Sequence, residues 1–332
     1  MTSQYSPHKD PLISVIMATY NGERFIREAI DSILNQTFSD FEFIIVDDGS
    51  TDDTAQIIQS YSDERIIYIK KELNSGIADS LNIGLVESKG VYIARMDDDD
   101  VSISTRFIEQ LKIFQHNEEV IFCGSNVSDN NSKPLRTPEV HDDIFLELLF
   151  RNPVFHPTVM MKKKILIDNP YKIDTVPSED YDLWSRLIFK GKFYQIQKPL
   201  LYCRVHQTSV TVTRRHEQLQ QNIHIAKFMF EKLGFNNLKN HEENLRIFAS
   251  KDYNISGKML KNLIFWFKEL KVINQSKLVF PIEEFNKVCD EQLERFLVSY
   301  FTNQKLYKKV IPYFYLNSNF KLLILKYYLK KG

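Results

Sequence analysis

Short apolar runs alternate with amphipathic stretches along the N-terminal part of the chain. Apolar, β-branched runs predict buried strands over Ile13–Thr19, Phe41–Asp47, Ile66–Ile69, Val91–Met96 and Val120–Gly124. The stretches between them carry apolar residues at helical spacing and predict helices over Arg24–Asn35, Thr54–Tyr61, Gly76–Val86 and Ser104–Gln115. Such an alternation is typical of an α/β fold with a doubly wound sheet and helices on both faces.

The pattern changes twice further along the chain. A loop is expected over Asn126–Thr137, and shorter elements follow it: helices over Ile144–Arg151 and Asp180–Lys190, and strands over Thr158–Met161, Phe193–Ile196 and Leu200–Arg204. From about His216 the pattern becomes helical and basic. We therefore expect two regions, an α/β domain over 1–215 and a helical region over 216–332.

Acidic residues follow two of the predicted strands. Asp47-Asp48 comes after the second strand and Asp97–Asp100 after the fourth, and ligands of such sheets bind outside the carboxyl ends of strands. Adjacent carboxylates repel one another, and a hard cation such as Mg²⁺ or Mn²⁺ relieves that repulsion. Asp97 and Asp99 alternate along an extended chain and so point the same way. A solvated acidic turn is the alternative, and the position after a buried strand favours the metal.

Three further polar clusters have both a structural and a functional interpretation. In Asp47–Asp52, the residues Ser50, Thr51 and Asp52 suit a helix cap, which leaves Asp48 as a surplus acceptor for a base or a ribose. Glu179-Asp180 begins an apolar helix, either as dipole-stabilising acids or as a general base. The segment 204–209 is either a surface loop or a basic cradle for a leaving diphosphate.

Composition removes several classes of site. The ten glycines never form G-x-G, and no P-loop pattern is present, so a glycine cradle for NAD or ATP phosphates is excluded. The three cysteines are widely spaced, which favours free thiols in a reducing cytoplasm over a disulfide framework or a zinc site. We expect neither a signal peptide nor a membrane-spanning segment, because no long apolar run occurs.

The charge is balanced overall but not along the chain. The 43 basic and 43 acidic side chains cancel, which argues against a nucleic-acid partner. Residues 1–215 hold 24 basic and 32 acidic side chains, whereas 216–332 hold 19 and 11. The segment 305–332 carries seven lysines, seven Phe or Tyr and no acid. It suits either an anionic membrane surface or packing against the core or a second subunit in a homodimer.

Taken in order, several segments resemble glycosyltransferase family 2, whose members have the GT-A fold and invert configuration. The segments are SVIMATYNGERFIREAIDSILNQTFSDFEFIIVDDGSTDDT (14–54), NSGIADSLNIGL (74–85), YIARMDDDD (92–100), NPVFHPTVMM (152–161), SEDYDLWSRL (178–187) and LYCRVHQTS (201–209). Within the family they are most similar to bacterial enzymes that extend lipooligosaccharide, O-antigen or capsule chains. The resemblance implies a GT-A-type mixed sheet in a nucleotide-sugar-binding catalytic domain over 1–215.

The resemblance also implies roles for individual residues. Asp97 and Asp99 match the D-x-D pair that holds Mn²⁺ or Mg²⁺ on the diphosphate, with Asp98 between them. Asp180 matches the catalytic base, supported by Glu179. The nucleotide site would comprise Ala18, Thr19, Tyr20, Asp48, Asn74, Gly76, Asn82, Asp97 and Asp98. His156, Arg204 and His206 match positions near the donor phosphates or the acceptor.

The implied activity is transfer of a hexose or N-acetylhexosamine from a UDP-sugar to a hydroxyl of an oligosaccharide or lipid-linked acceptor. One in-line displacement would give a β-linkage. The expected location is the cytoplasm, either in solution or peripheral on the inner face of the cytoplasmic membrane. Two alternatives remain: a sugar-nucleotide nucleotidyltransferase, which normally needs a glycine-rich triphosphate loop, and a non-catalytic UDP-sugar-binding protein. The intact Asp97, Asp99 and Asp180 favour an enzyme.

Overall fold

The computed structural model describes residues 10–128, 134–204, 213–250 and 255–303. The chain forms two compact units. Unit 1 comprises Met1–Glu147 and Asn152–Gln218, and unit 2 comprises Leu148–Arg151 and Leu219–Gly332. The division after Gln218 lies close to the boundary at 215 expected from the sequence. His206 and the basic segment 305–332, to which the sequence analysis gave roles, lie outside the described residues.

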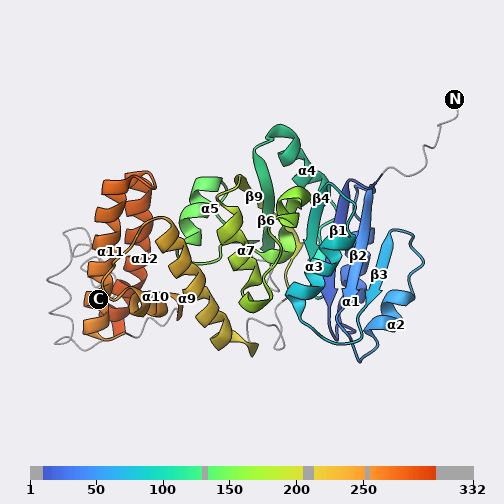
Figure 1. Ribbon diagram of the computed structural model, residues 1–332, viewed down its shortest axis with the longest axis horizontal. Coiled ribbons are helices and arrows are strands. Elements are labelled where there is room, and N and C mark those ends of the chain that lie inside the picture. The colour runs from blue at the N-terminus through green and yellow to red at the C-terminus, as the bar shows by residue number, and fades with distance from the viewer. Residues whose placement is uncertain (1–9, 129–133, 205–212, 251–254, 304–332) are drawn as a thin grey trace. The chain divides into compact units, whose positions relative to one another are not determined.

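Four parallel strands form one half of the sheet in unit 1 (Figure 1). They are β1 (Ile13–Thr19), β2 (Phe41–Asp47), β3 (Ile66–Lys70) and β4 (Tyr92–Met96), in the order β3-β2-β1-β4. Every residue of β2 is buried, as expected for a parallel strand covered on both faces. The predicted strands are therefore confirmed, with ends that differ by one residue at most.

The first four helices of unit 1 are also as predicted, within two residues at each end. They are α1 (Ile26–Leu34), α2 (Thr54–Gln59), α3 (Ile77–Glu87) and α4 (Arg106–His116). Helices α1 to α3 lie between these strands in the chain, and α4 precedes β6 (Val120–Ser128). Helix α1 buries Ile26, Ala29, Ile30 and Ile33, which share one face at this spacing. Because apolar faces of the helices cover the sheet, the carboxyl ends of the strands and their loops are left to form a site.

The second half of the sheet contains antiparallel pairs and departs in part from the prediction. It comprises β5 (Val101–Ser102), β6 (Val120–Ser128), β7 (Pro134–Leu135), β8 (Met160–Lys162) and β9 (Lys192–Tyr202). Strand β8 joins β4 to β6, antiparallel to both, and β9 lies parallel to β6. The doubly wound, mixed GT-A-type sheet that was expected is thus confirmed.

Two predictions in this half were wrong. The strands expected at 193–196 and 200–204 are one strand, β9, because Pro199 occupies a register shift opposite Asn126, where a proline is tolerated. The loop expected from Asn126 is instead the end of β6. Asn126 is buried, and its side-chain oxygen accepts hydrogen bonds from the N–H and the hydroxyl of Thr137, each at 2.9 Å. Because its side chain is hydrogen-bonded, the polar Asn126 can continue the buried strand.

The remaining elements of unit 1 are short helices and turns. They are α5 (His141–Leu148), α6 (Lys163–Ile167), α7 (Glu179–Leu187) and the 3₁₀ turns η1 (His156–Thr158) and η2 (Ile173–Thr175). Helix α7 is anchored by the fully buried Trp184, whose ring packs edge-on against Phe122 at 4.7 Å between centroids. This anchor fixes the first turn of α7, which carries Glu179 and Asp180.

Unit 2 is helical, as the sequence predicted. The described helices are α9 (Arg215–Lys232, which begins in unit 1), α10 (His241–Ser250), α11 (Gly257–Lys277) and α12 (Ile282–Asn303). The core of unit 2 is aromatic: Phe150, Phe230, Phe235, Trp266 and Phe267 are all buried. Many of the abundant aromatic residues therefore serve packing. Among the described helices, none combines the length and the apolar character that a bilayer-spanning segment requires.

Candidate active site

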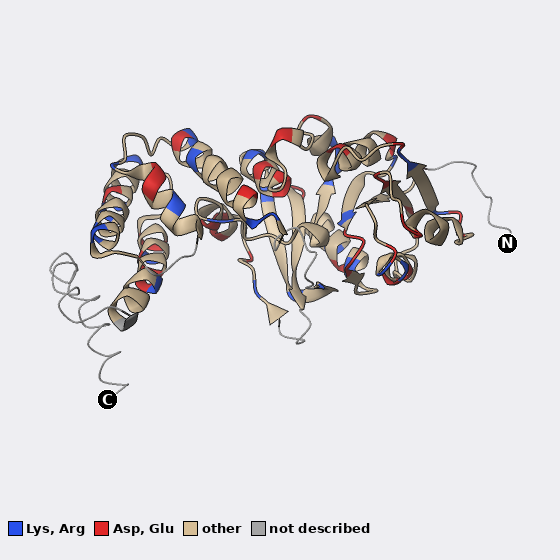
Figure 2. Ribbon diagram, turned by 90° about the horizontal axis from the view of Figure 1, so that it is seen from below, with Lys and Arg blue, Asp and Glu red and all other residues tan. Residues whose placement is uncertain are grey.

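The loops that follow β1, β2 and β4 meet at the carboxyl edge of the parallel strands. Figure 2, in which Asp and Glu are red, shows acidic residues in the loops of unit 1. The loop after β1 is bonded to the loop after β2: Asn21 accepts the N–H of Thr51 at 2.9 Å, and the Asn21 N–H donates to Ser50 at 3.0 Å. Of the residues expected to cap α2, only Asp52 does so, by accepting the Thr54 N–H at 3.0 Å. The other two hold the β1 loop.

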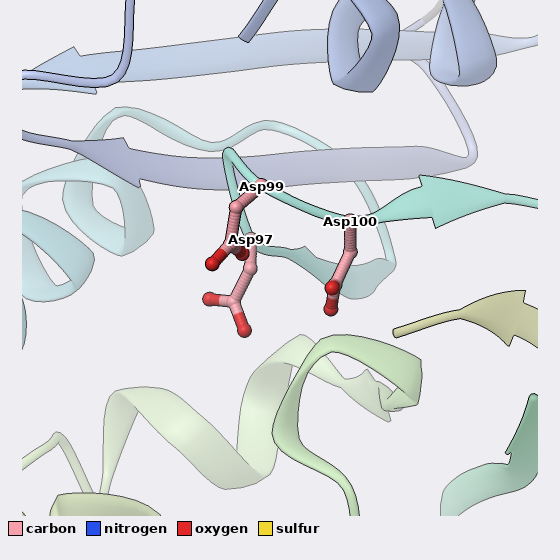
Figure 3. Close-up of side chains that lie close together, drawn as sticks. All are labelled: Asp97, Asp99 and Asp100. Atoms are coloured by element: carbon pink, nitrogen blue, oxygen red, sulfur yellow. The ribbon is translucent and has the colours of Figure 1, made fainter. Parts of the chain in front are cut away.

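An acid cluster lies where β4 ends. Asp97, Asp99 and Asp100 each offer an oxygen within 4.8 Å of the others, and Figure 3 shows the three side chains on one side of the loop that joins β4 to β5. Burial raises the pKa of Asp97 and, more strongly, that of Asp100, and the neighbouring carboxylates raise both further. Oxygen ligands packed this closely fit a hard divalent cation. Asp100 was not expected among the ligands.

Asp98, in contrast, belongs to the β1 loop. The hydroxyl of Thr19 donates to its Oδ2 at 2.5 Å. A Cβ at Gly22 would lie 2.5 Å from that same oxygen, so the glycine leaves room for the contact. Burial raises the pKa of Asp98 to about 7, and the Thr19 hydrogen bond opposes the shift. The structure thereby separates Asp98 from the three clustered carboxylates, a distinction that the DDDD sequence does not make.

Two buried arginines lie beneath the acid cluster. Arg95, on β4, forms an ion pair with Asp97 and also donates to the Met96 carbonyl oxygen. Arg106, on α4, donates to the carbonyl oxygens of Pro157 at 2.5 Å and Arg95 at 3.2 Å. Burial lowers the pKa of Arg106 to about 9, against the effect of the Asp100 charge. Both arginines are within 1% of complete burial and compensate part of the acidic charge.

Glu179 and Asp180 form an acidic pair at the start of α7, and the charge of Asp97 acts on both. The amide of Asn152 donates to Asp180 Oδ2 at 2.7 Å. Burial and, to a smaller extent, the charge of Asp97 raise the pKa of Asp180 to about 6, against the opposing effect of hydrogen bonds from Tyr181 and Asn152. Burial and the Asp180 charge raise the pKa of Glu179 to about 7. Among the residues that the structure describes, Glu179 Oε2 is buried without a hydrogen-bond partner, which favours the protonated acid there.

His156 is held beside this pair through Tyr171. The His156 Nε2 lies 2.8 Å from the Tyr171 hydroxyl. Burial and the Arg95 charge lower the pKa of His156 well below its usual range, so the ring is neutral. Asn82 bonds the backbone of Tyr171 in both directions, at 2.9 and 3.0 Å. Asn82, which the resemblance assigns to the nucleotide site, thus also supports the backbone of Tyr171.

Asp48 is buried in the loop after β2 and accepts several hydrogen bonds. Its carboxylate accepts from Lys71 Nζ at 2.5 Å and from the N–H groups of Ser75 and Gly76 at 3.0 and 2.8 Å. Gly76 has a φ of 96°, which suits glycine, as it begins α3. Asn74 lies next to these residues and is exposed. Asp48, Asn74 and Gly76 thus gather as expected, and Lys71 joins them.

The remaining predicted residues lie at the end of β1 and the end of β9. Ala18 is half-buried and Tyr20 is exposed, beside the Thr19–Asp98 contact. The Arg204 N–H donates to Asp100 Oδ1 at 2.9 Å, so its backbone joins the acid cluster. Its guanidinium instead pairs with Glu28 at 2.6 Å and stacks 4.6 Å from the Phe25 ring centre.

Comparisons with known proteins agree with this arrangement. The model of the family described as Glycosyl transferase family 2 matches residues 14–171. An O-antigen biosynthesis glycosyltransferase of Escherichia coli, WbnJ, is 34% identical over 60% of this chain and 81% of its own length. The chain belongs to glycosyltransferase family 2. Another E. coli relative, the β-1,3-glucosyltransferase WfaP, is 34% identical over 64% of this chain and 84% of its own.

Solved structures share the fold at lower identity. S. aureus TarS 1–349 in complex with UDP has a TM-score of 0.59 at 17% identity, covering 89% of this chain and 92% of its own. The mannosyltransferase PcManGT of Pyrobaculum calidifontis, solved with GDP-Man and Mn²⁺, has a TM-score of 0.52 at 16% identity, covering 90% of this chain and 89% of its own.

For this family 2 chain, the sequence identified the acidic residues of the site and missed most of their supports. Arg95 and Asn152 both lie inside the segments that carry the resemblance. An arginine within a buried apolar strand is a detectable signal, because such a charge requires a partner. Lys71, Arg106 and Tyr171 have no such signal, since their roles arise only from packing.

Proposed function

We propose that the protein is a metal-dependent inverting glycosyltransferase that moves a hexose or N-acetylhexosamine from a UDP-sugar to a hydroxyl of a growing bacterial surface glycan, with a β-linkage. One observation carries the proposal: the charge of Asp97, in the acid cluster, acts on the buried Asp180, whose own carboxylate is oriented by Asn152. A candidate cation site and a candidate base are thereby combined at one edge of the sheet.

The donor assignment rests on the acid cluster and on the fold relatives. TarS has been solved with UDP and with UDP-GlcNAc, and the name of WfaP gives UDP-Glc as its donor. Asp97, Asp99 and Asp100 would hold Mn²⁺ or Mg²⁺. Such an ion, when bound, neutralises charge on the diphosphate of the departing UDP. Asp48, Asn74 and Gly76, with Thr19 and Tyr20, would border the nucleoside.

Asp180 would act as the general base. Its carboxylate accepts the proton of the acceptor hydroxyl while that oxygen forms a bond to the anomeric carbon. The bond from the anomeric carbon to the diphosphate oxygen breaks on the opposite face, and UDP leaves with the electron pair. A single displacement of this kind inverts the configuration, so an α-linked donor gives a β-linked product. Glu179 would support the base. Arg204 and the neutral ring of His156 would lie toward the phosphates or the acceptor.

The acceptor would be a lipid-linked oligosaccharide of an O-antigen, lipooligosaccharide or capsule pathway. The name of WfaP gives a diphosphoundecaprenol-linked sugar as its acceptor. We place the protein in the cytoplasm, peripheral on the inner face of the membrane, where such acceptors present their sugars. Flotation with anionic liposomes tests this placement, and a protein that stays with the soluble fraction contradicts it.

A UDP-release assay tests the proposed function. The full chain is incubated with each of a panel of UDP-sugars, with and without a polyprenyl-diphosphate-linked sugar, in the presence of Mn²⁺. Acceptor-dependent UDP release and a β-linked product by NMR are expected. Release of pyrophosphate from UTP and a sugar phosphate would favour the nucleotidyltransferase alternative. Tight UDP binding without turnover would favour a binding protein.

A further inference from the structure

A cavity lies in unit 1 at the opposite edge of the sheet from the acid cluster. Its volume is about 530 Å³, which suits a small ligand. Strand β4 runs from the cavity to the acid cluster. Met96, at its carboxyl end, leads into the acid cluster. Tyr92, at its other end, pairs with Lys162, which lines the cavity. The starts of β6 and β9 lie at this same edge, since Val120 pairs with Lys192.

Four lysines line this cavity, from two segments of the chain: Lys162 and Lys164, and Lys190 and Lys192. Two acids line it as well, Glu118 and Glu119. Within the described parts of the chain, none of the four lysines forms an ion pair with a carboxylate. The ammonium of Lys162 instead donates to the carbonyl oxygen of Glu118 at 2.5 Å. The cavity thus holds more positive than negative side chains and leaves the positive ones without carboxylate partners.

The cations of the cavity repel one another. Burial and the charge of Lys164 lower the pKa of Lys162, and Glu118 only partly opposes them. Burial and the charge of Lys192 lower the pKa of His141. His141 Nδ1 accepts the N–H of Phe193 at 3.3 Å, so the neutral ring carries its hydrogen on Nε2 and can donate from there. A bound anion relieves this repulsion and supplies the missing acceptors.

We propose that this cavity binds a phosphate-bearing anion through the ammonium groups of Lys162, Lys164, Lys190 and Lys192. Phosphate fits because its oxygens accept from several ammonium groups at once and its charge matches more than one lysine. Ile121, Ile165 and Ile188 provide the apolar part of the lining. The site is separate from the donor site, because the length of β4 lies between them, roughly 13 Å at about 3.3 Å per residue.

Calorimetric titration with inorganic pyrophosphate tests the proposal. EDTA is present throughout, so that no cation bridges pyrophosphate to the acid cluster. The variant K190Q/K192Q removes two exposed ammonium groups whose side chains make no hydrogen bond or ion pair with any of the described residues. The matched control K112Q/K198Q removes two exposed charges of the same unit outside the cavity. We expect at least tenfold weaker binding for K190Q/K192Q and wild-type affinity for the control.

Vesicle sedimentation distinguishes the two sources of such a phosphate. Wild type and both variants are mixed with phosphatidylglycerol vesicles or with phosphatidylcholine vesicles. Weaker binding of K190Q/K192Q to the anionic vesicles indicates a lipid headgroup, and equal vesicle binding indicates a soluble phosphate compound. Pyrophosphate affinity that is the same in wild type and K190Q/K192Q overturns the proposal, as does a wild type that binds no pyrophosphate. Neither measurement uses a donor sugar or an acceptor, so failure here is distinct from failure of the glycosyltransferase proposal.

Discussion

The side-chain amide of Asn152 donates to Asp180 Oδ2 at 2.7 Å, and the N–H of Tyr181 donates to the other oxygen of Asp180 at 2.6 Å. These two bonds fix the carboxylate at the start of α7. They also favour its ionised form, against the effect of burial. Asn152 therefore both positions the carboxylate of Asp180, the proposed base, and lowers its pKa.

The variant Asp180→Asn tests the base directly. The amide keeps the size of the side chain but cannot accept the proton of the acceptor hydroxyl. We expect kcat to fall by about 100-fold to 10,000-fold, the usual contribution of a general base, whereas UDP affinity remains near that of wild type. Transfer at the wild-type rate would contradict the assignment.

The variant Asn152→Ala separates positioning from chemistry. Loss of a hydrogen bond to a charged group corresponds to roughly 2 kcal/mol, so we expect kcat to fall about tenfold or more. The pKa of Asp180 should also rise, because the lost bond favoured the ionised form. The acidic limb of the pH–rate profile would then move to higher pH. A fall in kcat without any movement of that limb would show that Asn152 acts on structure alone.

The pH–rate profile of the wild type has a predictable sign. Asp180, with a pKa of about 6, acts as a base only when ionised. Activity should therefore be full above about pH 7 and decline as the pH falls through 6. Because Glu179 is close by with a pKa of about 7, the limb belongs to the pair. A kcat that stays constant from pH 8 to pH 5 would exclude Asp180 as the base.

Metal dependence can be tested with neighbouring residues as controls. EDTA should stop turnover, and Mn²⁺ or Mg²⁺ should restore it. We expect Asp97→Asn and Asp99→Asn each to weaken Mn²⁺ binding by tenfold or more, as measured by electron paramagnetic resonance. Asp98→Asn is the matched control, because the Asp98 carboxylate bonds Thr19 and lies outside the acid cluster. Equal loss of Mn²⁺ affinity in all three variants would contradict the separation of Asp98.

Asp98→Asn should change stability in a pH-dependent manner. The pKa of Asp98 is raised from 3.8 to about 7, so between these values the folded state binds a proton that the unfolded state lacks. The free energy of unfolding therefore falls as the pH rises through this window. Asparagine does not titrate, so the variant avoids this decrease in the free energy of unfolding. We expect it to be more stable than wild type at pH 8 by on the order of 1 kcal/mol. Urea denaturation in EDTA at pH 5 and pH 8 measures the difference, which should shrink at the lower pH.

The parallel half of the fold and the acidic residues of the site could be predicted from the sequence. Continuous apolar runs mark strands such as Phe41–Asp47, because a strand covered on both faces has no polar alternation. Strand β9 could not be predicted as one strand, since Pro199 and the polar residues around it hide a bulged but continuous pairing. The same limit applies to the site. The supports Arg106 and Tyr171 are distant in sequence from the residues they contact, and only the tertiary fold brings them together.

Asp100 belongs to two structures at once. It is one of the three clustered carboxylates, and its Oδ1 accepts the backbone N–H of Arg204 at the end of β9. An ion that draws charge from this carboxylate weakens it as an acceptor for Arg204, and a firmer hold on Arg204 weakens it as a ligand. By thermodynamic reciprocity each event changes the free energy of the other. With the proposed cation bound, ion occupancy and the backbone position of Arg204 would therefore be linked variables, so that a change at one is felt at the other.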